Sequence, residues 1–312
     1  MNHSTPLDRR TAAIVRRWRA VMLRLNAPLL IGGLLVALLV GGALLAPLLA
    51  PHDPLEPILR MVGGQIAPAP YPPGTPGMPL GSDRLGRDML SRLIYGSRYT
   101  LLICAVAALA RLVIGAVLGM LAAWYSRTSR AIDVLIGASS AIPSLFFAMV
   151  PIAVVNRSRD IDTSLAIFMV ALSLTGWAET AVRCRTAVHG LRAAPFIDSA
   201  YAIGLRRGAI LYRHVLPNLR DVLLIEGAYA LAATLLLLAE LAFLNIVLGG
   251  GEPALIGDRM LASDPIFAEW GSMLARGLRQ RAYLWLFLEP LVAFTLAILG
   301  FNLLAEGLRR RR

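Results

Sequence analysis

Long apolar runs alternate with short polar segments along most of the chain, and this pattern predicts helices that cross a membrane. Each run is long enough to span about 30 Å of hydrocarbon at 1.5 Å of rise per residue. The first run is longer than the ~7–15-residue apolar core of a signal peptide, so we expect it to be retained. The predicted spans are residues 27–50, 99–125, 134–155, 163–182, 222–248 and 284–305. The sequence therefore predicts an all-α polytopic membrane protein with six transmembrane helices.

The composition supports this prediction and argues against a soluble enzyme. Hydrophobic residues make up 57% of the 312 residues, charged residues make up 16%, and the mean hydropathy is +0.65. Soluble proteins have roughly 45–50% apolar and roughly 25% charged residues. Residues 51–80 contain nine prolines, which are incompatible with a helix interior or an inner strand. We therefore expect an extended segment outside the membrane after the first span.

The distribution of arginine predicts the orientation. The segments 1–26, 125–133, 183–221 and 306–312 together hold 19 arginines and five acidic residues, whereas the connecting segments on the other side hold 11 arginines and ten acidic residues. Basic segments remain on the cytoplasmic side, so both termini are predicted to be cytoplasmic. The net charge of +12 is thereby explained without a nucleic-acid partner.

Residues for catalysis or for a cofactor are missing from the sequence. All 31 basic residues are arginine, so the chain has neither a phosphate-binding Gly-Lys-Ser/Thr loop nor a Schiff-base lysine. Cys104 and Cys184 are the only cysteines, and they suggest neither a disulfide framework nor a zinc site. We therefore expect no enzyme activity, no cofactor and no metal site in this chain.

The segment 183–221 is the only large cytoplasmic loop in this topology, and it has the pattern of two short amphipathic helices. Pro195 can begin a helix that Gly204 can end in a left-handed turn. A second helix follows, and Pro217 is expected to end it. Its apolar face is Ile210, Leu211, His214 and Val215. Such an element could simply lie on lipid headgroups.

The spacing within this loop indicates a more specific role. Asp198-Ser199-Ala200, three residues, Gly204, nine residues and then His214-Val-Leu216-Pro217 resembles the coupling motif of ABC importer permeases, Glu-Ala-Ala, three residues, Gly, nine residues and Ile-x-Leu-Pro. In that family the short helix docks in a groove of the ATP-binding subunit. The resemblance implies that these residues couple the chain to an ATPase, although Asp198 and Ser199 replace the usual Glu and Ala.

Other segments extend the resemblance over nearly the whole chain. Residues 79–96, from Pro79-Leu-Gly81-Ser-Asp83 to Tyr-Gly96, are similar to the stretch before the second span in the "C" permease of dipeptide, oligopeptide and nickel importers. Similar matches are Glu240-Leu-Ala-Phe-Leu, Trp270-Gly271 and Phe301-Asn302. The resemblance implies a type I ABC importer permease fold over 99–312, preceded in 1–98 by a cytoplasmic tail, a first helix outside the five-helix core and the Pro-rich outer segment.

The family resemblance implies a function and a set of partners. It implies a subunit of the bacterial cytoplasmic (inner) membrane that works with a second homologous permease, two ATP-binding subunits and an extracytoplasmic substrate-binding protein, all embedded in or next to membrane lipid. The expected cargo is a short peptide, with nickel or another small solute as the alternative. A proton-coupled secondary transporter or a membrane enzyme would be the rivals from other classes.

Charges inside the predicted spans are candidate functional residues, because ionisable groups are costly in a bilayer. Arg111 lies near the middle of the second span and Glu240 lies in the fifth. We expect either an ion pair of Arg111 with Glu240 or a contact of Arg111 with the partner permease; a position of these charges on the translocation path is the alternative. Gly115 and Gly119 form a Gly-x-x-x-Gly face that permits close helix packing.

Overall fold

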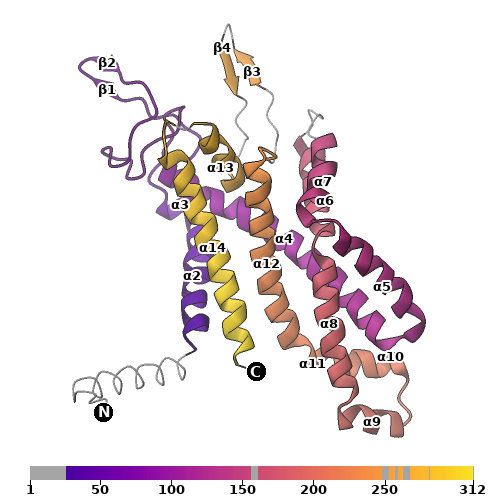
Figure 1. Ribbon diagram of the computed structural model, residues 1–312. Coiled ribbons are helices and arrows are strands. Elements are labelled where there is room, and N and C mark those ends of the chain that lie inside the picture. Colours follow the sequence, from indigo (N-terminus) through magenta and orange to yellow (C-terminus); the bar gives the residue numbers. More distant parts are fainter. Residues whose placement is uncertain are drawn as a thin grey trace, which may run out of the picture.

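The computed structural model describes residues 26–155, 161–247, 253–256, 259–262, 268–280 and 282–311. The described chain is a bundle of helices with two small hairpins at one end (Figure 1). Five helices are long and apolar enough to cross a membrane, and a bent helix pair makes a sixth if it counts as one span. The helices are α2 Ala27–Leu44, α3 Ala46–Leu49, α4 Met89–Trp124, α5 Ser126–Ala141, α6 Ser144–Val155, α7 Ile161–Leu174, α8 Trp177–Arg192, α9 Pro195–Ala202, α10 Arg207–Ile210, a π-helix over Leu211–Val215, α11 Leu216–Asn218, α12 Arg220–Phe243, α13 Trp270–Arg279 and α14 Trp285–Arg309. The all-α polytopic prediction is confirmed.

The segment between the first two spans has no helix after α3. Residues 50–88 form turns and one hairpin, β1 Met61–Val62 with β2 Gln65–Ile66, as the prolines lead us to expect. A second hairpin, β3 Pro253–Ile256 with β4 Arg259–Ala262, lies at the same end of the bundle (Figure 1). The rest of the outer segment 249–269, up to residue 267, and the basic leader 1–25 lie outside the described residues.

The third predicted span is wrong as a single straight helix. It is divided between α5 and α6, whose axes differ by 84° over Ser126–Ala141 and Ser144–Val150. Pro143 has no N–H, and it disfavours helical geometry at the preceding residue. Ile142 is accordingly extended, with φ −102° and ψ 123°. The apolar run therefore encodes a sharp bend that composition alone does not reveal.

The fourth predicted span is also wrong at its boundaries. Gly176, at φ +70°, separates α7 from α8, and α8 continues to Arg192. The span therefore extends ten residues into the segment 183–221, which was predicted to be loop. Arginines on α8 are tolerated because they have partners, such as Arg183 with Glu226 and Arg185 with Asp133. The connecting loop itself comprises residues 193–219.

The helices pack closely where small residues line the contact. A Cβ atom on Gly115 would lie 2.6 Å from the backbone oxygen of Trp177, and one on Gly119 would meet the backbone of Ala181. The close packing predicted for this Gly-x-x-x-Gly face is therefore confirmed, with α8 as the neighbour of α4. The first span, α2, lies beside α14 at the edge of the bundle, and only Gly32 and Ala43 of α2 are buried (Figure 1).

We expect Gly119→Val to prevent α4 and α8 from packing, because the added atoms would meet the backbone of Ala181 rather than a movable side chain. The measurement is the yield of monodisperse protein in detergent. Gly33→Val in α2 is the control, since nothing lies within 4 Å of a Cβ there. Equal yields of the two variants would contradict the expected clash.

Candidate functional site

The helix α9 forms the tip of the loop 193–219, at the end of the bundle opposite the hairpins (Figure 1). Pro195 occupies its first turn, where a missing N–H costs no intrahelical bond. Ile197 and Ala200, three residues apart, are its buried side chains. They join an apolar cluster with Trp124, Val188 and other residues at the ends of α4 and α8. The helix is therefore fixed through one face only.

The opposite face of α9 is exposed and combines apolar and acidic groups. Asp198 and Ser199 are exposed, and the Ser199 hydroxyl donates a hydrogen bond to the Pro195 oxygen at 3.1 Å. Exposed apolar side chains lie on both sides of this pair: Phe196, Tyr201 and Ile203, the last with 76% of its surface exposed. The three predicted motif residues therefore do not share one face. Asp198 and Ser199 point outward, whereas Ala200 anchors the helix.

Gly204 ends this helical segment in the left-handed conformation that the sequence predicts. Its φ is +80°, and its N–H donates to the Tyr201 oxygen at 2.9 Å. The next N–H, of Leu205, donates to the Ala200 oxygen at 3.2 Å. These two bonds satisfy carbonyls at the helix end. Nothing within the chain lies within 4 Å of a Cβ placed on Gly204, so its outer side is open.

The second short helix is continuous past the predicted break at Pro217, so that prediction is wrong in its position. Pro217 lies in the first turn of α11, which ends at Asn218. The preceding turn is a π-helix, in which the N–H of Leu216 bonds to the Leu211 oxygen five residues back. This wider turn accommodates the proline ring in a helical chain. His214 and Leu216 are half-buried and Pro217 is exposed.

Two side chains that the sequence analysis did not single out fix the loop to the bundle. The indole N–H of Trp124, the last residue of α4, donates to the Arg207 oxygen at 3.1 Å. Arg192, the last residue of α8, donates to the Ala123 oxygen at 2.6 Å, and its guanidinium lies 5.6 Å from the centre of the Trp124 ring. A Trp at the end of an apolar run is a signal for such a boundary position. The loop is therefore bonded to the end of α4, and the ends of α4 and α8 are bonded to each other.

Arg111 bonds α7 rather than Glu240, so the expected ion pair with Glu240 is wrong, whereas a contact with a partner permease stays a prediction. The Nε of Arg111 donates to the Leu172 oxygen at 2.7 Å, and another guanidinium nitrogen bonds the Thr175 hydroxyl. Only 3% of its surface is exposed. A cation is favourable at the C-terminal end of a helix, here α7. Arg111 therefore stabilises the break between α7 and α8, and Glu240 is a half-buried residue of α12 that does not pair with it.

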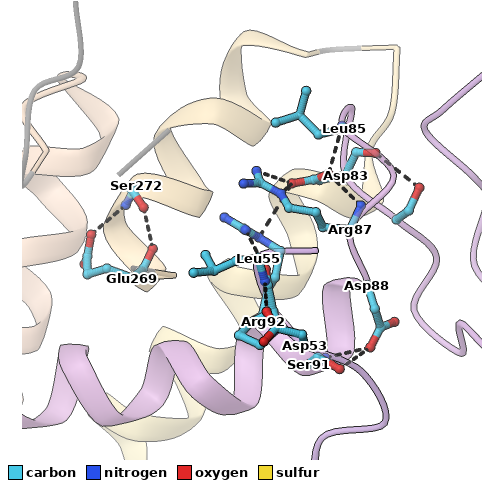
Figure 2. A network of polar contacts seen from close by, with 12 residues as sticks. Asp53, Leu55, Asp83, Leu85, Arg87, Asp88, Ser91, Arg92, Glu269 and Ser272 are labelled. Atoms are coloured by element: carbon cyan, nitrogen blue, oxygen red, sulfur yellow. Dashed lines mark hydrogen bonds and ion pairs between the residues drawn. The ribbon is translucent and has the colours of Figure 1, made fainter. Parts of the chain in front are cut away.

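The motif 79–96, at the end of the bundle that carries the hairpins, forms a network of hydrogen bonds around Asp83 (Figure 2). Asp83 accepts from the Arg87 Nε at 2.7 Å and lies 3.6 Å from the Arg92 Nε. Arg92 in turn donates to the Pro54 oxygen at 3.0 Å. Asp88 accepts from the N–H of Ser91 at 2.8 Å and so caps α4. The network holds the Pro-rich segment on the start of α4.

A second cap, also drawn in Figure 2, orders the helix α13 at the same end. Glu269 accepts from the N–H groups of Gly271 at 2.6 Å and Ser272 at 2.8 Å. Burial raises the pKa of the Glu269 carboxyl, and these two hydrogen bonds offset part of that shift. The Trp270 indole donates to the Leu93 oxygen at 2.9 Å and packs edge-on against Phe294. The predicted Trp270-Gly271 motif therefore joins α13 to α4 and α14.

Two structural features of the described residues bear on function: the placement of the His, Cys, Asp and Glu side chains and the exposed face of α9. Among the residues that the structure describes, no group of three His, Cys, Asp or Glu side chains is placed to hold a metal ion. The face of α9 that points away from the bundle is exposed, and its opposite face packs beside the ends of α4 and α8.

Comparisons with known proteins give a family match and several named relatives. Residues 115–311 match the family described as binding-protein-dependent transport system inner membrane component. A dipeptide transport system permease protein of Alkalihalophilus pseudofirmus is 30% identical over 99% of this chain and 92% of its own length. A di/tripeptide transport system permease protein of Pseudomonas aeruginosa is 32% identical over 89% of this chain and 86% of its own. A glutathione transport system permease protein of Pectobacterium atrosepticum is 30% identical over 74% and 70%.

Proposed function

We propose, since this chain belongs to the family of inner membrane components of binding-protein-dependent transport systems, that it is the permease subunit of an ATP-driven importer of short peptides. It is a multi-pass protein of the inner membrane, and it supplies a path rather than a catalytic centre. Nickel and other small solutes remain the alternative cargo. Peptides are favoured because relatives that align over most of both chains carry names that specify dipeptides or tripeptides.

The observation that carries the proposal is the exposed face of α9. Asp198, Ser199 and the apolar side chains beside them face outward, whereas Ile197 and Ala200 fix the helix to the bundle. We propose that this face, with the turn at Gly204, docks on an ATP-binding subunit. His214, Leu216 and Pro217 lie in the consecutive helical turns from Arg207 to Asn218, which follow the turn at Gly204 and precede the start of α12 at Arg220.

The orientation follows from this proposal and from the distribution of arginine. The α9 end is cytoplasmic because it meets the ATPase there, and the basic segments agree. α2 and α14 then place both termini on the cytoplasmic side. The opposite end, with the Asp83 network and both hairpins, faces the extracytoplasmic substrate-binding protein. A second homologous permease completes the path, because one chain of this size leaves α8 and α12 lining an open cavity.

The proposal is tested by isolating the tagged chain from its native host in mild detergent and identifying the copurifying proteins by mass spectrometry. We expect a second multi-pass permease and an ATPase with a phosphate-binding loop. In cells, uptake of a labelled dipeptide should stop on ATP depletion and continue when an uncoupler collapses the proton gradient but ATP is maintained. A chain that transports alone and responds only to the uncoupler would show that the proposal is wrong.

A further inference from the structure

An ion pair joins the two helices that enter and leave the cytoplasmic loop. The Nη1 of Arg183 on α8 donates a hydrogen bond to the Oε2 of Glu226 on α12 at 3.1 Å. The Glu226 side chain is only 9% exposed, whereas Arg183 is 46% exposed. A carboxylate this buried is costly unless a cation pairs with it. The pair is therefore a defined contact of the native structure rather than a chance meeting of two surface charges.

Two further groups orient the Arg183 guanidinium. It lies 5.7 Å from the centre of the Tyr229 ring, also on α12, within the range of a cation–π interaction. The carboxylate of Glu179, one turn earlier on α8, accepts from the Nη2 of Arg183 at 3.4 Å. Glu179 is 74% exposed and belongs to the same helix as Arg183, so it cannot connect α8 to α12. Both interhelical contacts of Arg183 are thus made with α12.

The pair borders a cavity. This cavity has a volume of about 910 Å³, and Arg183, Glu226 and Tyr229 are among its lining residues. Arg183 lies nine residues before the end of α8 and Glu226 six residues after the start of α12, about 14 Å and 9 Å along the two axes. The contact is therefore set back from the loop, farther along both helices than the apolar cluster that contains Val188 of α8 and Val222 of α12.

Each of the two helices has a different main neighbour. α8 packs on α4, where Gly115 and Gly119 face Thr180 and Ala181. α12 packs on α14 and on another part of α4. A force applied at α9 could accordingly spread the two helices apart instead of moving them together. The ion pair opposes this separation, because parting the two residues would leave the Glu226 carboxylate, which is only 9% exposed, without its cation.

We propose that Arg183 and Glu226 act as a strut that makes α8 and α12 move as one unit when α9 is displaced. Through this link, closure of the ATPase would change the side of the membrane to which the path opens. Without the link, the loop would move but the helices that line the path would not follow. Both are positioning residues, since neither needs to touch cargo or ATP. This inference rests on the proposed coupling of α9 to an ATPase.

The test measures ATP hydrolysed per peptide imported by the complete complex in proteoliposomes. We expect Arg183→Gln and Glu226→Gln each to raise this ratio by about tenfold while the complex still assembles. The double variant Arg183→Glu with Glu226→Arg restores a pair of opposite charges, and we expect it to recover most of the coupling. A ratio unchanged in both single variants, or a double variant no better than either single one, would overturn the strut.

Two substitutions serve as matched controls. Glu179→Gln removes the carboxylate that bonds Arg183 within α8, and we expect less than about a twofold change, as for exposed i,i+4 pairs. Arg310→Gln removes an arginine whose partner, Glu306, lies on its own helix. A tenfold rise in either control would mean that loss of charge, rather than loss of the link between α8 and α12, uncouples transport.

A second measurement separates failure of the strut from failure of the proposed function, because it needs neither ATP nor cargo. Spin labels on cysteines placed at His189 of α8 and Asp221 of α12, both exposed, report the distance between the helices in the purified chain. The native Cys104 and Cys184 are buried and should label poorly. We expect a broader distance distribution in Arg183→Gln and a narrow one in the charge-reversed double variant. If the distance distribution is equally wide in the parent protein, in Arg183→Gln and in the double variant, the strut proposal is wrong even if transport is as proposed.

Discussion

Replacing Gly204 with arginine is expected to reduce peptide uptake to the background of cells that lack the chain, while the protein still inserts in the membrane. The φ of +80° makes any L-residue costly at this position, by about 1–2 kcal/mol. The larger effect is steric and external to the chain. Nothing lies within 4 Å of the missing Cβ, so the side chain would project from the turn into the space that the ATPase is proposed to occupy.

Two further substitutions separate the backbone effect from the steric one. Asn adopts the left-handed region more readily than other non-glycine residues, so we expect Gly204→Asn to retain most of the uptake. Gly190→Arg introduces the same side chain in α8, where the backbone is helical and nothing lies within 4 Å of a Cβ, and we expect it to be tolerated. The measurements are uptake of a labelled dipeptide and recovery of the ATPase with the tagged chain.

The outcome decides whether this loop couples the chain to an ATPase. Loss of uptake together with loss of the copurifying ATPase in Gly204→Arg, but not in Gly190→Arg, supports docking at α9. Normal uptake by Gly204→Arg would show that this loop does not couple the chain to an ATPase. Loss of the chain from the membrane would instead mean that the left-handed turn is needed for folding, and Gly204→Asn, which can adopt that turn, would then be recovered better than Gly204→Arg.

The features predicted best from the sequence are those set by local rules. Pro195 and Gly204 limit the backbone by their own chemistry, so the helix between them follows from their spacing. The spans were found because hydrocarbon requires about 20 apolar residues whatever surrounds them. Which residues of α9 point inward does not follow from spacing alone. Phe196 is four residues from Ala200, and Ile197 is four residues from Tyr201, yet only Ile197 and Ala200 are buried.

The features that the sequence did not predict depend on neighbours distant in the chain. A charge count treats Arg183 and Arg185 as loop residues, but both lie on α8 because Glu226 and Asp133 pair with them from other helices. The bend at Pro143 could have been only a kink, as proline is tolerated in many membrane helices. Its full angle depends on the packing of α5 and α6 against other elements.

Arg111 illustrates the same limit and leads to the second large prediction. Glu240 is the acidic partner that the sequence suggests for Arg111. The actual acceptors are the backbone oxygen of Leu172 and the hydroxyl of Thr175. Those acceptors are available because α7 ends there and Gly176 turns the chain at φ +70°. The Arg111 guanidinium fills that turn, since a Cβ on Gly176 would lie 3.2 Å from the Nη1 of Arg111.

We expect Arg111→Met to destabilise the fold strongly rather than to alter the choice of cargo. Methionine preserves most of the apolar stem, so the loss isolates the hydrogen bonds. A hydrogen bond to a charged group contributes about 1.5–3 kcal/mol, and the Leu172 oxygen would lose the Arg111 N–H in a buried site. The measurement is the thermal stability of the purified chain in detergent, together with recovery of its partner subunits.

Arg127→Met, at an exposed position of α5, is the control for loss of one arginine, and we expect it to behave as the parent protein. Thr175→Val tests the contact from its other side and should destabilise the chain less than Arg111→Met, because the bond to Leu172 remains. If Arg111→Met instead assembles fully and imports a different set of peptides, the guanidinium contacts cargo on the path. Because Arg111 also borders the cavity between α8 and α12, stability and cargo choice must be measured on the same preparation.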